Sequence, residues 1–479
     1  SAGYGFDRKT LTTKPIIFPE ESQAFKLHEK AHVENAYVSA FSTLSYSLLN
    51  RYTLGGSIRF DGSDLFGVDK KYRYLPLYSV SGLWRISQEP FMASAKWIDN
   101  LVVRASYGLQ GNIDKNTSPF LPGGSEDMID VSGAPNKKLR WEKTHSVNAG
   151  FDFAVLNQAI NLSVDYYYRK GVDLIGTQML PLETGFEMLT VNWASMRNQG
   201  VEVALSRRNV HTKNFMWTTN FNFAYNNNKV LKEALREDAL EPGREGYPAG
   251  ALFALKTAGL DEEGYPMFQD KDGKAVSAME FFKLQEWGFG ATDLTARERR
   301  ELYTYVGTAD CPYTGGFNNT FTYKAFELGV NFSFDFGGKV RSQPTYSIVD
   351  FDKGRNTNRD ILNRWTPENT ETIFPVLLSQ NERLDEYMWY SNQNEIYRNL
   401  DIWIRDLNYV RLQNIRLGYT LPTNFSRTLG MTSATVAIEG RNLLVFGSSY
   451  KNYLDPETMS NAYATPAPKS VTLSLNLIF

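Results

Sequence analysis

Residues 215–225 read FMWTTNFNFAY, and two kinds of side chain alternate along the whole stretch. One face carries Phe215, Trp217, Thr219, Phe221, Phe223 and Tyr225, and the other carries Met216, Thr218, Asn220, Asn222 and Ala224. Such strict alternation predicts a β-strand with one apolar and one polar face. The same period of two recurs at 145–155, 160–169 and 328–336. The pattern therefore predicts an all-β, antiparallel fold.

The composition narrows the class of protein. The chain has 479 residues, with 51 Lys and Arg against 53 Asp and Glu, and a net charge of −2. This balance argues against a broad surface for nucleic acid. A single cysteine, Cys311, rules out an intramolecular disulfide framework and a Cys-rich zinc site. No apolar run approaches the roughly 18 residues of a membrane helix, so a helical membrane protein is excluded. A membrane β-barrel is not excluded, because alternating polar residues give its strands a mean hydropathy like that of a soluble protein.

Two architectures compete for this pattern. A soluble sandwich buries the apolar face in a core, whereas a membrane barrel turns it to lipid around a polar lumen. The expected strands run to about 10–15 residues, which is long against the usual five or six. Their polar faces hold Asn, Ser, Arg and Asp, and aromatic residues gather near strand ends, where interfacial girdles lie. These features favour the transmembrane β-barrel.

The alternation predicts about 13 strands. They lie near 36–48, 51–61, 72–87, 100–111, 142–155, 158–170, 198–209, 213–226, 316–324, 326–337, 405–420, 431–444 and 470–479. A break of phase predicts a bulge around Gln413 and Asn414. Residues 277–303 have a helical composition, and a possible extra strand near 251–258 is treated as part of a loop.

Connection lengths predict the topology, because outer-membrane barrels have short periplasmic turns and long extracellular loops. Long links are expected at 112–141, 171–197, 227–315, 338–404 and 445–469. The last strand then ends in the periplasm, and counting back assigns residues 1–35 to an extracellular loop and 36–479 to the barrel. An odd number of strands leaves an open edge, which lipid does not tolerate. We therefore expect the C-terminal part of a longer barrel.

Several strings are similar to the SusC/RagA-like family of TonB-dependent outer-membrane transporters. They are RYTLGGSIRFDGSDLFG (51–67), LPLYSVSGLWRISQEPF (75–91), LVVRASYGLQGN (101–112), LRWEKTHSVNAGFDF (139–153), MRNQGVEVAL (196–205), YTGGFNNTFTYKAFEL (313–328), YVRLQNIRLGYTLP (409–422), GRNLLVF (440–446) and DPE (455–457). The tail also resembles the assembly signal of outer-membrane proteins, with Val471, Leu473, Leu475, Leu477 and Phe479 on one face.

The resemblance implies a barrel of 22 strands around an N-terminal plug, in the outer membrane of a Gram-negative cell. It also implies a SusD-like surface lipoprotein as a lid, contact with the TonB complex through the plug, and import of bulky nutrients without enzymatic chemistry or a cofactor. Oligosaccharides are the first expectation for the cargo and oligopeptides the alternative. A siderophore receptor would share the architecture but not these strings.

Two groups of residues are candidates for contact with the cargo. Aromatic residues of the outer loops can stack on sugars or peptide side chains, or simply pack the loops together. They are Trp193, Tyr265, Trp287, Tyr313, Trp389, Tyr390, Tyr450 and Tyr453. Charged residues on polar strand faces, expected to face the lumen, can line the solute path or pair with a plug. They are Arg59, Arg104, Asp165 and Arg169.

A competing motif lies at residues 28–32, which read HEKAH. On a helix, His28 and His32 would bind zinc and Glu29 would act as the general base of a protease. The chain has only four histidines, and strand alternation starts within a few residues. The favoured interpretation is two solvated histidines in an outer loop, so we expect no metal site.

Overall fold

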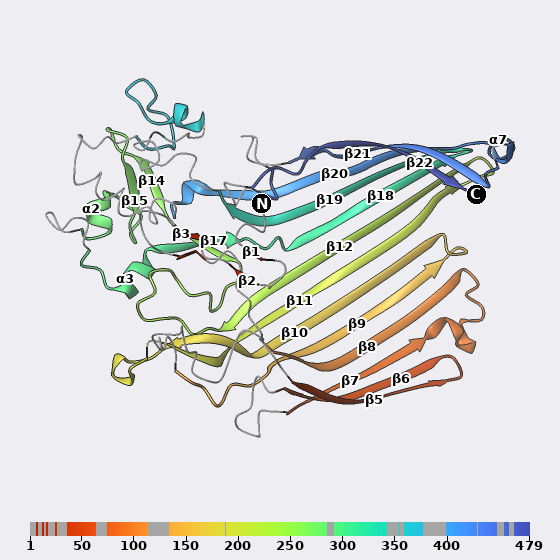
Figure 1. The fold of residues 1–479 in the computed structure, drawn as a ribbon, viewed down its shortest axis with the longest axis horizontal. Helices are drawn as coiled ribbons and strands as arrows, with labels where there is room; N and C mark the ends of the chain where they lie inside the picture. The colour runs from red at the N-terminus through yellow and green to blue at the C-terminus, as the bar shows by residue number, and fades with distance from the viewer. Residues whose placement is uncertain are drawn as a thin grey trace.

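The computed structural model describes residues 6–7, 12–13, 16–17, 24–25, 36–63, 74–113, 134–186, 188–284, 292–342, 354, 359–376, 399–428, 430–447, 455–458 and 464–479. A single antiparallel sheet of 13 strands dominates it, with β22 and β5 at its two edges (Figure 1). The strands are β5 (Tyr37–Leu48), β6 (Tyr52–Ser63), β7 (Tyr74–Arg85), β8 (Ile98–Asn112), β9 (Glu142–Val155), β10 (Ile160–Met179), β11 (Met188–His211), β12 (Phe215–Lys232), β18 (Tyr313–Tyr323), β19 (Phe326–Arg341), β20 (Ile404–Thr420), β21 (Ser433–Phe446) and β22 (Ser470–Ile478).

The 13 strands of the sheet are the 13 that the alternation predicts, so this prediction is confirmed. The predicted bulge is also present, because the pairing of β20 with β21 shifts register between Leu412 and Asn414. The largest differences are at two strand ends: β10 continues to Met179 and β11 begins at Met188, so both strands extend into the expected link at 171–197. A register shift between Gly171 and Leu174, with Asp173 at a φ of 57°, breaks the alternation that marks the strand.

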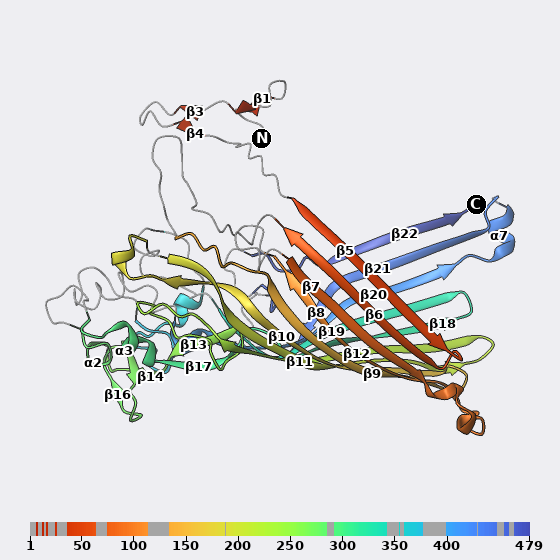
Figure 2. The ribbon, with the colours of Figure 1, turned by 90° about the horizontal axis from the view of Figure 1, so that it is seen from below.

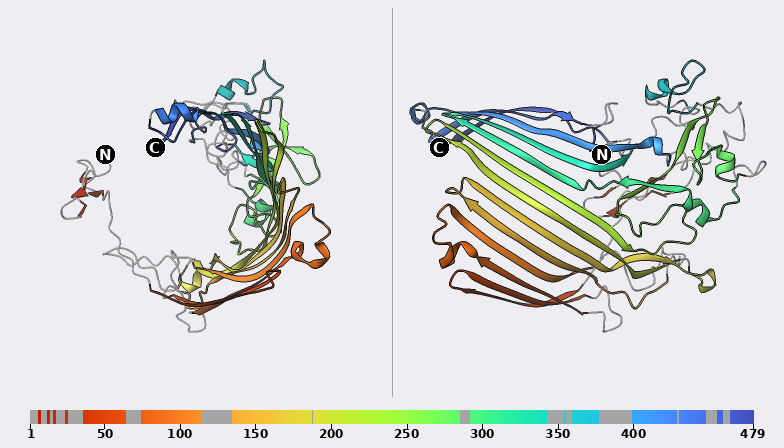
Figure 3. Two further views of the ribbon diagram at one scale, coloured as in Figure 1. Left: turned by 90° about the vertical axis from the view of Figure 1, so that its right-hand side faces the viewer. Right: turned by 180° about the vertical axis from the view of Figure 1, so that it is seen from behind.

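The sheet curves into an arc when it is seen from one end (Figure 3, left). The link between β7 and β8 lies on the convex side of this arc, and its Glu89 accepts hydrogen bonds from Tyr52 and Trp84. Tyr52 and Trp84 are register partners on the apolar face of their strands. The apolar face is therefore convex and the polar face concave, as in a wall of a membrane barrel. In the part of the chain that the structure describes, no helix has the length and apolar character needed to cross a bilayer.

The two ends of the strands differ (Figure 2). One end carries short turns, the helix α7 (Thr423–Thr428) and the C-terminus, as well as the 3-10 turns η1 (Ile86–Gln88) and η2 (Pro90–Met92). The other end carries the longer excursions. By the general rule for outer-membrane barrels, the short turns are periplasmic and the long loops extracellular.

The excursion after β12 folds into a small unit with its own core. Strand β13 (Ala251–Leu255) pairs with β17 (Tyr303–Thr308), and β14 (Thr257–Leu260), β15 (Pro266–Gln269) and β16 (Ala275–Val276) form a second sheet. The possible strand near 251–258 thus has its partner within the same loop. The expected helix of 277–303 is two short ones, α2 (Ala278–Phe281) and α3 (Ala296–Glu301). Leu255, Phe268 and Phe281 meet Leu400 and Trp403, which precede β20, so the unit is packed against the start of that strand.

The remaining short elements lie in the loops and at the N-terminal end. They are β1 (Phe6–Asp7), β2 (Thr12–Thr13), β3 (Ile16–Ile17), β4 (Ala24–Phe25), η3 (Leu182–Thr184), η4 (Arg359–Asn363) and η5 (Asp401–Trp403).

Candidate functional site on the concave face

A row of asparagines crosses the polar face from strand to strand. The members are direct register partners on β10, β11, β12, β18, β19 and β20. They are five asparagines and one serine, and we call these six residues the asparagine row: Asn161, Ser206, Asn220, Asn318, Asn331 and Asn414. Barrel strands are tilted, so a row of register partners climbs the wall diagonally. Because each amide offers both donors and acceptors, the row is a continuous series of hydrogen-bonding groups.

A shallow groove of about 430 Å³ follows the central part of the asparagine row and the next polar row. Its lining includes the small residues Ala154, Ala204 and Gly316, flanked by Asp152 and Asn222. The small residues Ala154, Ala204 and Gly316 leave space at the bottom of the groove, and the longer polar side chains beside them form its rim. The groove therefore combines neutral amides and a single carboxylate, that of Asp152, with apolar surface from residues such as Phe221 and Phe317.

Arg104 on β8 is the centre of a charged network on the same face. Its guanidinium pairs with Asp152 and donates to Asp165 over 2.6 and 3.2 Å. Ser163 accepts a hydrogen bond from Arg104 at 3.1 Å and donates to Asp152 at 2.8 Å. Each of the three charged side chains is roughly one-third exposed. The sequence predicts two of these residues, Arg104 and Asp165, and the structure brings them together with Asp152.

Gly150 explains how Arg104 on β8 reaches Asp165 on β10, two strands away. Gly150 on β9 is the register partner of both residues. A Cβ atom at this position would lie 2.3 Å from Oδ1 of Asp165. The glycine therefore leaves the space in which the ion pair crosses the middle strand. Alternation alone does not reveal this requirement, because a glycine on a polar face has no distinctive spacing.

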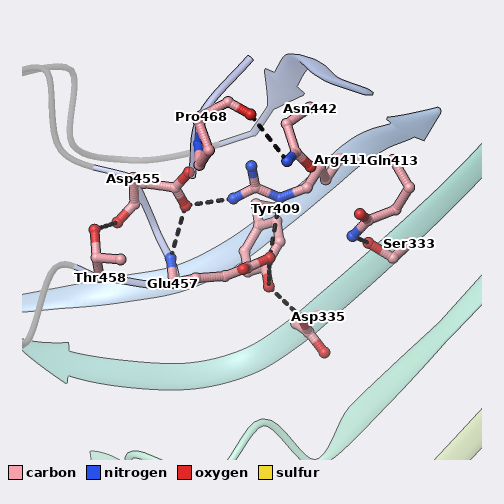
Figure 4. A network of polar contacts seen from close by, with 10 residues as sticks. All are labelled: Ser333, Asp335, Tyr409, Arg411, Gln413, Asn442, Asp455, Glu457, Thr458 and Pro468. Atoms are coloured by element: carbon pink, nitrogen blue, oxygen red, sulfur yellow. Dashed lines mark hydrogen bonds and ion pairs between the residues drawn. The ribbon is translucent and has the colours of Figure 1, made fainter. Parts of the chain in front are cut away.

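A second network ties an extracellular loop to the wall (Figure 4). Arg411 on β20 is only 2% exposed and binds both Asp455 and Glu457 of the loop between β21 and β22. Tyr409 donates to Asp335 on β19 at 2.5 Å and to Glu457 at 3.2 Å. The segment that contains DPE is thus anchored on the concave face by one buried guanidinium. The sequence identifies this string only through the family resemblance, and its role is visible only in the structure.

The charge of Asp455 depends on this contact. Burial by itself would raise the pKa of the Asp455 carboxyl, but the hydrogen bond and charge of Arg411, together with backbone hydrogen bonds from Glu457 and Ala467, outweigh it, and the pKa lies below its usual value. The carboxylate therefore stays ionised at neutral pH, and the buried guanidinium stays paired. Losing one member of such a pair leaves the other as an uncompensated buried charge.

The described aromatic residues of this group are engaged in packing, and two of them lie on strands instead of in loops: Trp193 on β11 and Tyr313 at the start of β18. The Nζ atom of Lys232 lies 3.5 Å from the ring centroid of Trp193, and Tyr265 packs against the core of the extracellular unit. Tyr313 stacks on Tyr225 with ring centroids 5.2 Å apart. These contacts favour loop packing over free stacking platforms. A cargo contact for these three residues stays a prediction.

Other predicted residues lie outside the described part of the chain. These are Trp287, Trp389, Tyr390, Tyr450 and Tyr453 of the loops, and His28, Glu29 and His32 of the HEKAH string. Within the ranges that the structure describes, no three His, Cys, Asp or Glu side chains are grouped as a metal site requires.

The last two predicted lumen residues make local contacts. Arg59 forms an ion pair with Asp61 on its own strand, at 2.6 Å from Nε to Oδ1. The guanidinium of Arg169 lies 5.0 Å above the ring of Tyr167, whose hydroxyl donates to Asn226 at 2.9 Å. A role for these residues in the solute path stays a prediction.

The C-terminal strand β22 pairs with β21 at the edge of the sheet. Its apolar side chains Val471, Leu473, Leu475 and Leu477 are exposed on the convex face, as expected for lipid contact, and Phe479, which follows the strand, is exposed as well. Their role as an assembly signal stays a prediction.

An antiparallel wall with an exposed apolar convex face and a polar concave face defines a class, the transmembrane β-barrels of outer membranes. Residues 30–443 match the family described as "TonB dependent receptor-like, beta-barrel". The chain belongs to this family of outer-membrane proteins.

Individual relatives agree with this assignment. The chain is 26% identical to TonB-dependent receptor SusC of Bacteroides thetaiotaomicron over 96% of this chain and 45% of that protein. It is also 26% identical to TonB-dependent receptor P3 of Formosa agariphila, over 93% and 46%. A structure titled "Structure of the RagAB peptide transporter" matches with a TM-score of 0.72 at 24% identity, over 92% of this chain and 48% of that one, which shows a common fold. The SusC/RagA-like resemblance is confirmed, and the chain spans about half the length of these relatives.

Proposed function

We propose that this chain forms the C-terminal wall of a TonB-dependent importer of the SusC type, which takes bulky hydrophilic nutrients across the outer membrane. The concave face with its asparagine row is the observation that carries the proposal. A hydroxylated or amide-rich solute would exchange water for hydrogen bonds with these side chains, and its apolar faces could contact the apolar part of the groove lining. The other half of the barrel, the plug and the contact with the TonB complex belong to the remainder of the protein.

Oligosaccharides are the favoured cargo. Neutral amides donate to and accept from hydroxyl groups without requiring a charge on the solute. Arg59, Arg104 and Arg411 on the concave face are paired with carboxylates of the chain itself, and this supports a neutral solute over one recognised by ion pairs. The peptide transporter among the similar folds keeps oligopeptides as the alternative. A SusD-like lipoprotein is the proposed lid, supported by the match to SusC.

The test is calorimetric binding to the full-length transporter, purified with its copurifying lipoprotein, of neutral oligosaccharide pools and of oligopeptide pools. We expect a saccharide to bind, and Asn220→Ala with Asn222→Ala to weaken binding. Both side chains are exposed on the concave face. Asn214→Ala, in a periplasmic turn, is the matched control and should bind as the unmodified protein does. Binding of peptides alone would replace the cargo class, and binding of neither pool would refute the import of these nutrients.

A further inference from the structure

The link between β7 and β8, residues 86–97, differs from the neighbouring periplasmic turns. The link between β5 and β6 contains only residues 49–51, and that between β9 and β10 only 156–159. Residues 86–97 instead form two 3-10 turns that fold over the convex face (Figure 3, left, in orange). The link therefore occupies the outer surface of the barrel at its periplasmic end, where the bilayer meets water.

Glu89 holds the link in this place. Its carboxylate is almost fully buried and accepts hydrogen bonds from the hydroxyl of Tyr52 at 2.5 Å and from the indole of Trp84 at 3.0 Å. Arg51 pairs with the same carboxylate at 3.4 Å. The hydrogen bond from Tyr52 contributes most to a lowered pKa of Glu89, so the carboxylate is charged and surrounded by donors. Two contacts from strands β6 and β7 and one from the turn between β5 and β6 thus fix the link against the wall.

The docked link leaves large apolar side chains uncovered. Phe91 is 65% exposed and Trp97 is 57% exposed. The ring of Trp97 lies edge-on to Phe153, with centroids 6.3 Å apart, and the link therefore continues the apolar surface of β9. Lys96, next to Trp97, is exposed as well. Aromatic rings with an adjacent cation suit the boundary between acyl chains and phosphate headgroups.

We propose that residues 86–97 form an interfacial anchor that inserts into the periplasmic leaflet of the outer membrane and binds phospholipid. Phe91 and Trp97 enter the acyl boundary, and Lys96 lies at the phosphates. The occupant is lipid because the surface is continuous with the lipid-facing wall. The inference rests on the outer-membrane location alone and does not depend on the cargo or the import mechanism.

The test measures the depth of a nitroxide label in the full-length transporter, reconstituted into phosphatidylethanolamine–phosphatidylglycerol vesicles. Labels are placed by Phe91→Cys, by Leu54→Cys on the apolar face as the lipid reference, and by Asp272→Cys in an extracellular turn as the water reference. Cys311→Ser and removal of other cysteines provide the background. We expect the label at 91 to be more accessible to oxygen than to a nickel chelate, at a depth of about 5–10 Å.

Two results would overturn the anchor. A label at 91 with the nickel accessibility of the label at 272 would place the link in water. A label shielded from both reagents would mean that a protein covers it. Adding Glu89→Ala should release the link and shift the label at 91 towards the water reference. An unchanged depth in that variant would refute the docking role of Glu89.

Discussion

Gly150→Ala tests whether the concave face is braced by an ion pair that crosses a strand. The added methyl group would lie 2.3 Å from Oδ1 of Asp165 and 2.7 Å from the carbonyl oxygen of Val164. Close carbon–oxygen contacts in proteins are about 3.3–3.6 Å, so the carboxylate must move by roughly 1 Å. That displacement disrupts the two hydrogen bonds from Arg104, now 2.6 and 3.2 Å long.

The size of the effect follows from exposure. Hydrogen bonds to charged groups contribute about 1.5–3 kcal/mol when well formed, whereas exposed ion pairs contribute about 0–1 kcal/mol. Arg104 and Asp165 are 32% and 34% exposed, between these limits. We therefore expect a loss of about 1–2 kcal/mol. This corresponds to roughly a tenfold larger unfolding constant.

The assay is urea unfolding of the full-length transporter in detergent micelles, followed by gel mobility. Gly329→Ala on β19 is the matched control, since nothing lies within 4 Å of its added Cβ. It should be neutral or slightly stabilising, because glycine is unfavourable within a strand. In an Asp165→Ala background, Gly150→Ala should lower the free energy of unfolding by less. A smaller loss should remain, because the added methyl group still meets the carbonyl oxygen of Val164. Equal losses of stability in Gly150→Ala and Gly329→Ala would refute the proposed role of the ion pair across β9. Strict additivity of Gly150→Ala with Asp165→Ala would refute it as well.

Three further predictions concern the loop and the last strand. Arg411→Met should release the segment around Asp455 without unfolding the sheet, seen as faster amide exchange at 455–458; unchanged exchange would mean that the guanidinium is not the anchor. Because the folded-state pKa of Asp455 is lowered, its contribution is present above the usual value of about 3.9 and lost as pH falls through the folded-state pKa. Protection of these amides should therefore persist at pH values where a free aspartate is half protonated, and early loss would contradict the pairing. Deleting Phe479 should lower the amount of assembled transporter in outer-membrane fractions, whereas Ser474→Ala should not.

The strands of the sheet could be predicted because each carries its own alternation. Where the structure extends β10 and β11 beyond the prediction, the cause is local. Asp173 adopts a left-handed conformation beside a register shift, and the period of two is interrupted there. A bulge hides a strand from a pattern that depends on strict phase.

The concave site could be predicted only in part. Alternation places Arg104 and Asp165 on polar faces, but their contact depends on register across three strands, which no single segment encodes. The asparagine row has the same origin, because Asn220 and Asn318 are far apart in the sequence and become partners through the pairing of β12 with β18. Register is set by the whole sheet, and so the site emerges only with the fold.

The two charged networks determine which polar groups of the concave face remain available to a solute. Arg104 is occupied by two aspartates and Arg411 by an aspartate and a glutamate. Asn220 and Asn222, by contrast, are exposed on the wall between these networks. On this part of the wall, a molecule in the lumen would meet the neutral amides of Asn220 and Asn222. The ion pairs that stabilise the wall thus also favour a cargo recognised through hydroxyl or amide groups. The variants separate stabilisation of the wall from recognition of the cargo: Gly150→Ala should affect stability, and Asn220→Ala should affect binding.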